Sequence, residues 1–216
     1  PVVVDDDSAV SVTADGSPYE YVDDYGYALE ATWTLPLGCV LRPAEGSWIP
    51  ATVAGSSALP MVKAGAFSCE SGTLTEVVSA PKGAAATTVI YDVACSDSAY
   101  AWVELDMATR AWQLYAAKFS GGALDGDAQK LWDGTSDYDP APVAVTGSKV
   151  VWQIMPSLSG KKTSEPSACY LWNVGDKDAR KVIESPGRFA IKPTVSNGNV
   201  ILAPRVHADE GTFYGV

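Results

Sequence analysis

Apolar stretches of this sequence come in pairs, and a short turn separates the members of each pair. Residues 142–152 read Pro-Val-Ala-Val-Thr-Gly-Ser-Lys-Val-Val-Trp, in which two apolar runs flank Gly147. Glycine, aspartate and asparagine tolerate the positive φ angles of tight turns, so this pattern predicts a β-hairpin. The same frame recurs from residues 50, 92 and 193, with turns expected at Gly55, Asp97 and Gly198.

A second apolar pair follows the first in three of these copies. The clearest example is the pair 168–174 and 180–183, which the turn 175–178 separates. The corresponding pairs in the two preceding copies are 112–119 with 130–132 and 66–69 with 75–78. Two hairpins in each copy predict four antiparallel strands per repeat.

The length of the repeat indicates a particular architecture. The copies begin at residues 50, 92, 142 and 193, so one repeat is 42 to 51 residues long. A four-stranded unit of about forty to fifty residues has the length of a β-propeller blade. Seven Trp and ten Tyr favour strands, while 19 Gly and 14 Pro interrupt the chain too often for long helices. We therefore expect an all-β fold, a β-propeller or a partial propeller.

The repeat frame also predicts how the chain is divided. Blades are expected at 50–91, 92–141 and 142–192, followed by an incomplete blade at 193–216. Residues 1–49 would be an acidic, divergent blade or an N-terminal extension. In a ring the first and last blades must meet, because open sheet edges invite pairing with another chain. The uneven count predicts either a portion of a larger propeller or self-association through open blade edges.

The best-preserved copy resembles a known family. Its Pro-to-Trp hairpin at 142–152 is followed by Tyr-Leu-Trp-Asn-x-Gly-Asp at 170–176 and by Arg-Lys-Val at 180–182. Over residues 50–205 this rhythm resembles the WD40-like propellers of the TolB type, although Val-Thr-Gly-Ser and Val-Ser-Asn-Gly replace that family's usual Ser-Pro-Asp-Gly turn. The resemblance implies a non-enzymatic scaffold of the bacterial cell envelope that binds a protein partner, with no catalytic residues to carry over.

The acidic charge is concentrated at one end of the chain. The net charge is −11, and residues 1–30 hold eight acids without a Lys or Arg. Nucleic acids and anionic membranes are bound through Lys and Arg, so we expect neither as a partner. The segment 19–27 could dock a cationic partner, with Tyr supplying contact area and Asp steering the approach. Its candidate residues are Tyr19, Tyr21, Asp23, Asp24, Tyr25 and Tyr27, and the alternative is a solvated edge with an aromatic strand face.

The cysteines bear on the compartment. The chain has four, Cys39, Cys69, Cys95 and Cys169, without a Cys-x-x-Cys pair and with His207 as the one histidine. Zinc sites need close ligand pairs, so no metal is predicted; disulfides with any of three pairings and buried free thiols both remain open. Cys, Trp and Tyr usage favours an extracytoplasmic location, with an export signal or anchor expected upstream of Pro1. No run of 18 apolar residues exists, so membrane insertion of this segment is not expected.

Other patterns offer weaker candidates. Asp125, Asp127 and the acids of 133–139 have the oxygen density that Ca²⁺ prefers, but they do not match an EF-hand loop and are better interpreted as turn residues. His207 lacks a nucleophile-elbow motif, which argues against a hydrolase. No cofactor is expected.

The second function class is a carbohydrate-active or carbohydrate-binding propeller. It would place carboxylates and Trp33 or Trp48 on a central face, although packing in the core is the better interpretation of all seven Trp. The carboxylates that could converge there are Glu30, Glu76, Glu104 and Asp106.

Overall fold

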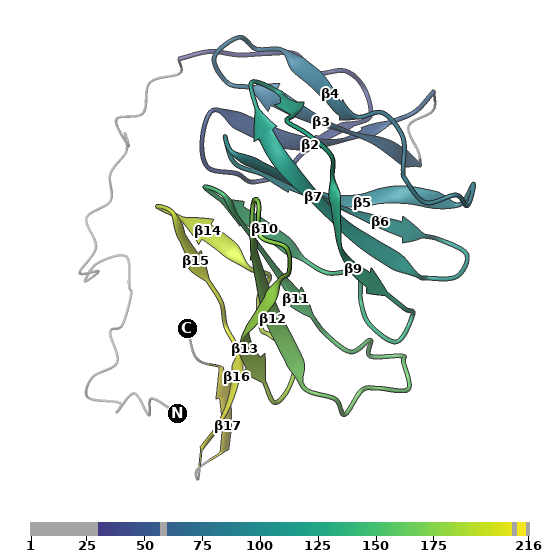
Figure 1. The fold of residues 1–216 in the computed structure, drawn as a ribbon, viewed down its shortest axis with the longest axis vertical. Coiled ribbons are helices and arrows are strands. Elements are labelled where there is room, and N and C mark those ends of the chain that lie inside the picture. The colour runs from purple at the N-terminus through teal and green to yellow at the C-terminus, as the bar shows by residue number, and fades with distance from the viewer. Residues whose placement is uncertain (1–29, 57–59, 209–210, 215–216) are drawn as a thin grey trace, which may run out of the picture. The chain divides into compact units, whose positions relative to one another are not determined.

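The computed structural model describes residues 30–56, 60–208 and 211–214, and these residues form antiparallel strands joined by turns (Figure 1). The all-β prediction is confirmed. The chain divides into two compact units, Pro1–Thr34 and Leu35–Val216. All of the described strands belong to the second unit, which is the subject of the following paragraphs.

Three successive sheets account for most of the second unit. The first sheet is β1 (Cys39–Leu41), β2 (Trp48–Ala54), β3 (Met61–Ser68) and β4 (Leu74–Val78), in that spatial order. The second sheet is β5 (Thr88–Cys95), β6 (Ala99–Asp106), β7 (Trp112–Ser120) and β9 (Gln129–Gly134), with β8 (Ala123–Leu124) pairing to the end of β7. The third sheet is β10 (Val143–Thr146), β11 (Lys149–Ile154), β12 (Ser167–Asn173) and β13 (Arg180–Ser185).

Two short hairpins follow the third sheet. They are β14 (Thr194–Ser196) with β15 (Asn199–Ile201), and β16 (Arg205–Ala208) with β17 (Gly211–Tyr214). The turn between β14 and β15 has positive φ angles at Asn197 (51°) and Gly198 (73°). Only residues that tolerate the left-handed region fit such a turn, which is why the Asn-Gly pair predicts it well.

The predicted strand pairs are confirmed in the copies that begin at residues 92, 142 and 193, but the copy that begins at residue 50 lies out of phase, because 61–68 form the single strand β3. The turns at Asp97, Gly147 and Gly198 each join the first two strands of their group. Gly55 instead follows the second strand of the first sheet, because β2 pairs with β1 as well as with β3. The repeat pattern did not predict β1, since a strand of three residues gives too short an apolar run to detect. The first sheet thus includes residues 39–41 and 48–49, which the repeat pattern assigned to the preceding segment.

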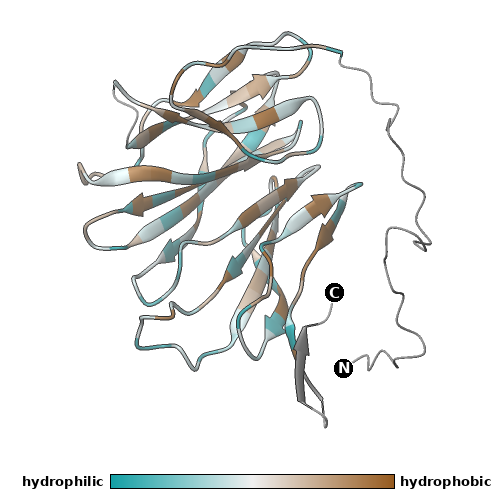
Figure 2. Cartoon of the chain, turned by 180° about the vertical axis from the view of Figure 1, so that it is seen from behind, coloured by the Kyte–Doolittle hydropathy of each residue, from teal (hydrophilic) through white to brown (hydrophobic). Residues whose placement is uncertain are grey.

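Side chains on opposite faces of the second sheet fill two separate cores. Tyr100 and Trp102 of β6 pack with side chains of the first sheet, while Val103 and Leu105 pack with the third sheet. This division follows from the alternation of side chains along a strand. Figure 2 shows the resulting mixture of apolar and polar residues along the strands. A third, smaller core joins the third sheet to the segment that follows it, through Val151, Cys169 and Phe189.

The tryptophans occupy three kinds of environment. Trp102, Trp112 and Trp152 are fully buried, and Trp172 is 3% exposed, so the prediction of a core position is confirmed for them. Trp48 and Trp132 are half-buried and pack against the cores. The prediction was wrong for Trp33, which is 43% exposed. Trp33 lies outside the repeated hairpins, in the first unit.

Candidate functional site

The first strands of the successive groups lie close to one another. β10 contacts both β5 and β14, although the three strands belong to different sheets (Figure 1). Each of these strands is the first strand of a hairpin and ends at the tight turn of that hairpin. The turns therefore gather at the same end of the three strands.

Hydrogen bonds connect these turns to one another. The backbone N–H of Ser47, in the β1–β2 loop, donates to Asp97 Oδ1 at 2.8 Å. Ser96, in the same β5–β6 turn as Asp97, donates from Oγ to the carbonyl of Gly147 in the β10–β11 turn at 2.6 Å. The N–H of Gly198, in the β14–β15 turn, donates to Oε2 of Glu45, in the β1–β2 loop, at 3.0 Å. The contact between β10 and β14 links the two remaining turns, and we call the whole set of contacts the turn ring.

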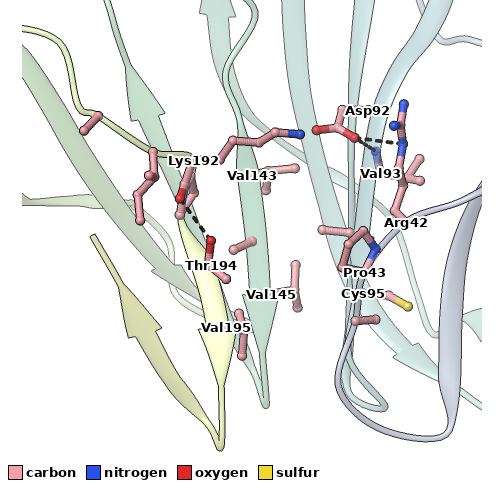
Figure 3. A pocket seen from close by; sticks show the side chains of 16 residues that line it. Arg42, Pro43, Asp92, Val93, Cys95, Val143, Val145, Lys192, Thr194 and Val195 are labelled. Carbon is pink, nitrogen blue, oxygen red and sulfur yellow. Dashed lines mark hydrogen bonds and ion pairs between the residues drawn. The ribbon is translucent and has the colours of Figure 1, made fainter. Parts of the chain in front are cut away.

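A hollow of about 530 Å³ lies between these first strands (Figure 3). Four short segments line it: 42–44, 92–95, 143–145 and 190–195. Its walls are mainly aliphatic because β10 and the facing part of β5 present valine and alanine, namely Val93, Ala94, Val143, Ala144 and Val145. Its volume lies within the range of about 300–1,000 Å³ that small-molecule sites occupy.

Three charged side chains lie at one level of the hollow. Arg42 Nε lies 3.4 Å from Asp92 Oδ1, and Lys192 extends toward the same carboxylate from the opposite wall (Figure 3). Burial raises the pKa of Asp92, while the charges of Arg42 and Lys192 and a hydrogen bond from the N–H of Val93 oppose that rise. Two cations therefore face a single, partly buried anion.

The other polar groups of the hollow are already engaged. Cys95 Sγ donates to the carbonyl of Trp48 at 3.5 Å, and burial together with the charge of Asp97 raises its pKa to about 12. The Cys95 thiol is therefore protonated at neutral pH and is not a nucleophile. Thr194 Oγ1 donates to the carbonyl of Lys192 at 3.2 Å.

The candidate carboxylates for glycoside hydrolysis do not meet in this hollow. Asp92 is the one carboxylate among its lining residues. Glu104 is fully buried and accepts hydrogen bonds elsewhere in the second sheet, and Glu76 pairs with Lys63 at 2.7 Å. Asp106 lies in an exposed turn network with Thr87 and Thr109, and Glu30 is exposed in the first unit.

Trp48, one of the two tryptophans proposed for a sugar-binding face, is engaged in other contacts. Trp48 packs edge-on against Phe119, with ring centroids 5.8 Å apart. Trp48 does not line the hollow, and Trp33 belongs to the first unit.

Three of the five acids proposed for Ca²⁺ are paired with cations in the structure. Asp125 lies 2.6 Å from Lys118 Nζ, Asp133 lies 2.7 Å from Lys130 Nζ, and Asp139 lies 2.6 Å from Arg188. Within the described ranges, no three His, Cys, Asp or Glu side chains form a group that could hold a metal ion.

The four cysteines are free in this structure. Cys95 and Cys169 are buried, whereas Cys39 and Cys69 are half-buried. Of the two alternatives that the sequence left open, the structure contains free thiols. His207 lies in β16.

The residues proposed to dock a partner, Tyr19, Tyr21, Asp23, Asp24, Tyr25 and Tyr27, lie outside the described residues. Sequence analysis missed the charged group of Arg42, Asp92 and Lys192. One signal was present: Asp92 interrupts the apolar strand Thr-Val-Ile-Tyr-Asp-Val-Ala-Cys and stands where the next copy of the repeat has Pro142.

Comparison with known proteins identified no family. The chain matches none of the protein-family models, and no curated protein matches it. In the described part of the chain, no helix has the length and apolarity that crossing a membrane requires. The functional argument therefore depends on the geometry of the hollow.

Proposed function

We propose that this chain is a β-propeller, or a part of one, that serves as a non-enzymatic binding module of the bacterial cell envelope and engages a protein partner. The successive four-stranded antiparallel sheets support the architecture, because that is the composition of propeller blades. The turn ring supports it further, since it brings the first strands of successive units around one hollow.

The observation that carries the proposed binding role is the hollow itself. It is concave, mainly aliphatic, and has a few charged groups at one level, which is the usual composition of a ligand site. The same composition argues against catalysis at this place. Glycoside hydrolysis needs two carboxyl groups on either side of the scissile bond, and the single carboxylate here faces two cations.

A substitution that fills the hollow tests this role. Thr194 is exposed and lines the hollow, so Thr194→Trp should occupy the space with little effect on folding. Ser196→Trp is the matched control, because Ser196 is exposed on the same strand but does not line the hollow. Affinity enrichment from an envelope extract should yield a protein that binds the wild type and Ser196→Trp and is lost with Thr194→Trp. A partner retained by Thr194→Trp would exclude the hollow as its binding site.

Carbohydrate activity is measured on the same proteins. Hydrolysis of glycosides by the wild type, abolished by Thr194→Trp, would favour the carbohydrate-active alternative over a scaffold. We expect no hydrolysis, because no second carboxyl group lines the hollow.

A further inference from the structure

The hollow is polar at one level and apolar at the next. Asp92 and Val143 begin their lining segments, Lys192 lies two residues before β14, and the strands then run toward the turn ring. Closer to the turns, the lining consists of Pro43, Val145 and Val195, with the protonated Cys95 (Figure 3). A ligand in this space would have a charged or polar end and an aliphatic end.

The charges at the polar level do not balance. Asp92 carries one negative charge, against the positive charges of Arg42 and Lys192. Asp92 forms an ion pair with Arg42 and not with Lys192. Within the described residues, no carboxylate lies within 4.0 Å of Lys192 Nζ. One positive charge is therefore left for a ligand to neutralise.

A hydrogen-bond donor at the same level is also unused. Arg42 Nε is buried, and in the described part of the chain it has no hydrogen-bond acceptor, because its contact with Asp92 at 3.4 Å is an ion pair without hydrogen-bond geometry. A buried donor without an acceptor is destabilising, so an oxygen that reached Arg42 Nε would be stabilised there. The excess positive charge and the unpaired N–H of Arg42 both favour a ligand with a negatively charged oxygen.

We infer that the hollow binds a carboxylate carried on a short, branched aliphatic chain, as in a C-terminal valine or leucine; this rests on the proposed binding function. The carboxylate would lie beside Lys192, and the alkyl group would pack against Val145 and Val195. A doubly charged phosphate fits less well because Asp92 would repel its second charge. A sugar fits poorly because Thr194 is the only hydroxyl among the lining residues.

Calorimetry with three probes tests the chemistry. The probes are N-acetyl-alanyl-valine with a free carboxylate, the same dipeptide as a C-terminal carboxamide, and 3-methylbutanoate. The wild type should bind the free dipeptide and not the carboxamide. Equal affinity for the two dipeptides would overturn the inference. Binding of the dipeptide alone would assign the carboxylate to a polypeptide C-terminus, whereas equal binding of 3-methylbutanoate would assign it to a small organic acid.

Two charge variants should shift the affinity in opposite directions. Lys192→Met removes the unpaired cation, which should weaken binding of the dipeptide about fivefold, as expected for a partly exposed ion pair. Asp92→Asn removes the competing anion and should tighten binding. Lys177→Met removes a cation from an exposed position outside the hollow and should leave the affinity unchanged. A loss of affinity with Asp92→Asn, or an equal loss with Lys192→Met and Lys177→Met, would contradict the inference.

The test of the carboxylate ligand and the test of the proposed binding function can fail independently. Lys192 is exposed, so Lys192→Met remains informative even where Asp92→Asn fails to fold, and thermal unfolding of each variant checks this. If the wild type binds none of the carboxylates while a partner is still lost with Thr194→Trp, the ligand chemistry is wrong and the binding function stands. If Thr194→Trp has no effect on any partner and the dipeptide binds, the ligand chemistry is right and the proposed binding of a protein partner in the hollow is wrong.

Discussion

The indole N–H of Trp102 donates a hydrogen bond to Glu104 Oε1 at 2.9 Å, and both side chains are fully buried. The same carboxylate accepts hydrogen bonds from the backbone N–H groups of Lys82 and Gly83, each at 2.8 Å. Glu104 thus ties the segment that precedes the second sheet to the centre of that sheet. A buried carboxylate with three donors is a structural group, which explains its position away from the hollow.

Removing this carboxylate should strongly destabilise the fold. Glu104→Ala leaves three donors unpaired, and we expect a loss of about 3 kcal/mol or more in the free energy of unfolding. Urea denaturation measures this value. Glu76→Ala is the control, because its exposed ion pair with Lys63 is worth less than about 1 kcal/mol. Equal losses in the two variants would show that the buried hydrogen bonds contribute little.

Two tryptophans in equivalent register isolate the contribution of one hydrogen bond. Trp102 pairs with Val93 and stacks on Tyr115, as Trp152 pairs with Val143 and stacks on Tyr170. The indole N–H of Trp152, unlike that of Trp102, has no acceptor among the described residues.

Substitution by phenylalanine should therefore cost more at the first position than at the second. Both changes remove similar volume, but Trp102→Phe also removes a hydrogen bond to a charged group, worth about 1.5–3 kcal/mol. Denaturant titration of the two variants gives the difference. A larger loss for Trp152→Phe would contradict the assignment of an unpaired N–H.

Acid should remove the stabilising effect of Asp106. Hydrogen bonds from Thr109 Oγ1, Thr87 Oγ1 and the N–H of Ala108 lower the pKa of this exposed carboxylate to about 2. A carboxylate with a lowered pKa in the folded state stabilises the fold above its unfolded pKa, and the effect disappears as the pH falls through the folded pKa. The melting temperature of Asp106→Asn should lie below that of the wild type at pH 6, and the difference should close between pH 4 and pH 2. A constant difference would exclude this titration.

The cysteines should separate by accessibility. Burial raises the pKa of Cys95 and of Cys169 to about 12, so their thiolates are scarce at neutral pH. Maleimide should modify the half-buried Cys39 and Cys69 first under native conditions, and all four should react after denaturation without reductant. Mass spectrometry counts the adducts. Fewer than four adducts in denaturant would indicate a disulfide.

The contact between Glu45 and Gly198 should hold the β14–β15 hairpin in place. Glu45→Ala removes the acceptor for the Gly198 N–H, while Glu45→Gln retains an oxygen. We expect faster amide hydrogen exchange in 194–201 for Glu45→Ala, a smaller change for Glu45→Gln, and none in the second sheet. Unchanged exchange in Glu45→Ala would show that the hairpin is held by its apolar contacts alone.

Strand pairing could be predicted from the sequence, whereas the hollow could not. The hairpins around Asp97 and Gly147 follow from local patterns, because turn chemistry and alternation act over a few residues. The short strand β1 was missed, and with it the β1–β2 loop that carries Arg42 and Glu45. Arg42, Asp92 and Lys192 come from three distant parts of the chain, so their meeting depends on how the sheets pack against one another.

The β1–β2 loop is synthesised early, but its contacts are completed late. Its contact with Asp97 joins residues 50 positions apart, whereas its contact with Gly198 joins residues 153 positions apart. On a chain that emerges from its N-terminus, the loop must therefore wait for most of the sequence to be synthesised before its second partner exists. Contacts between such distant residues are slow to form, since a long loop must close first. The hollow should thus be among the last parts of the protein to acquire its final shape.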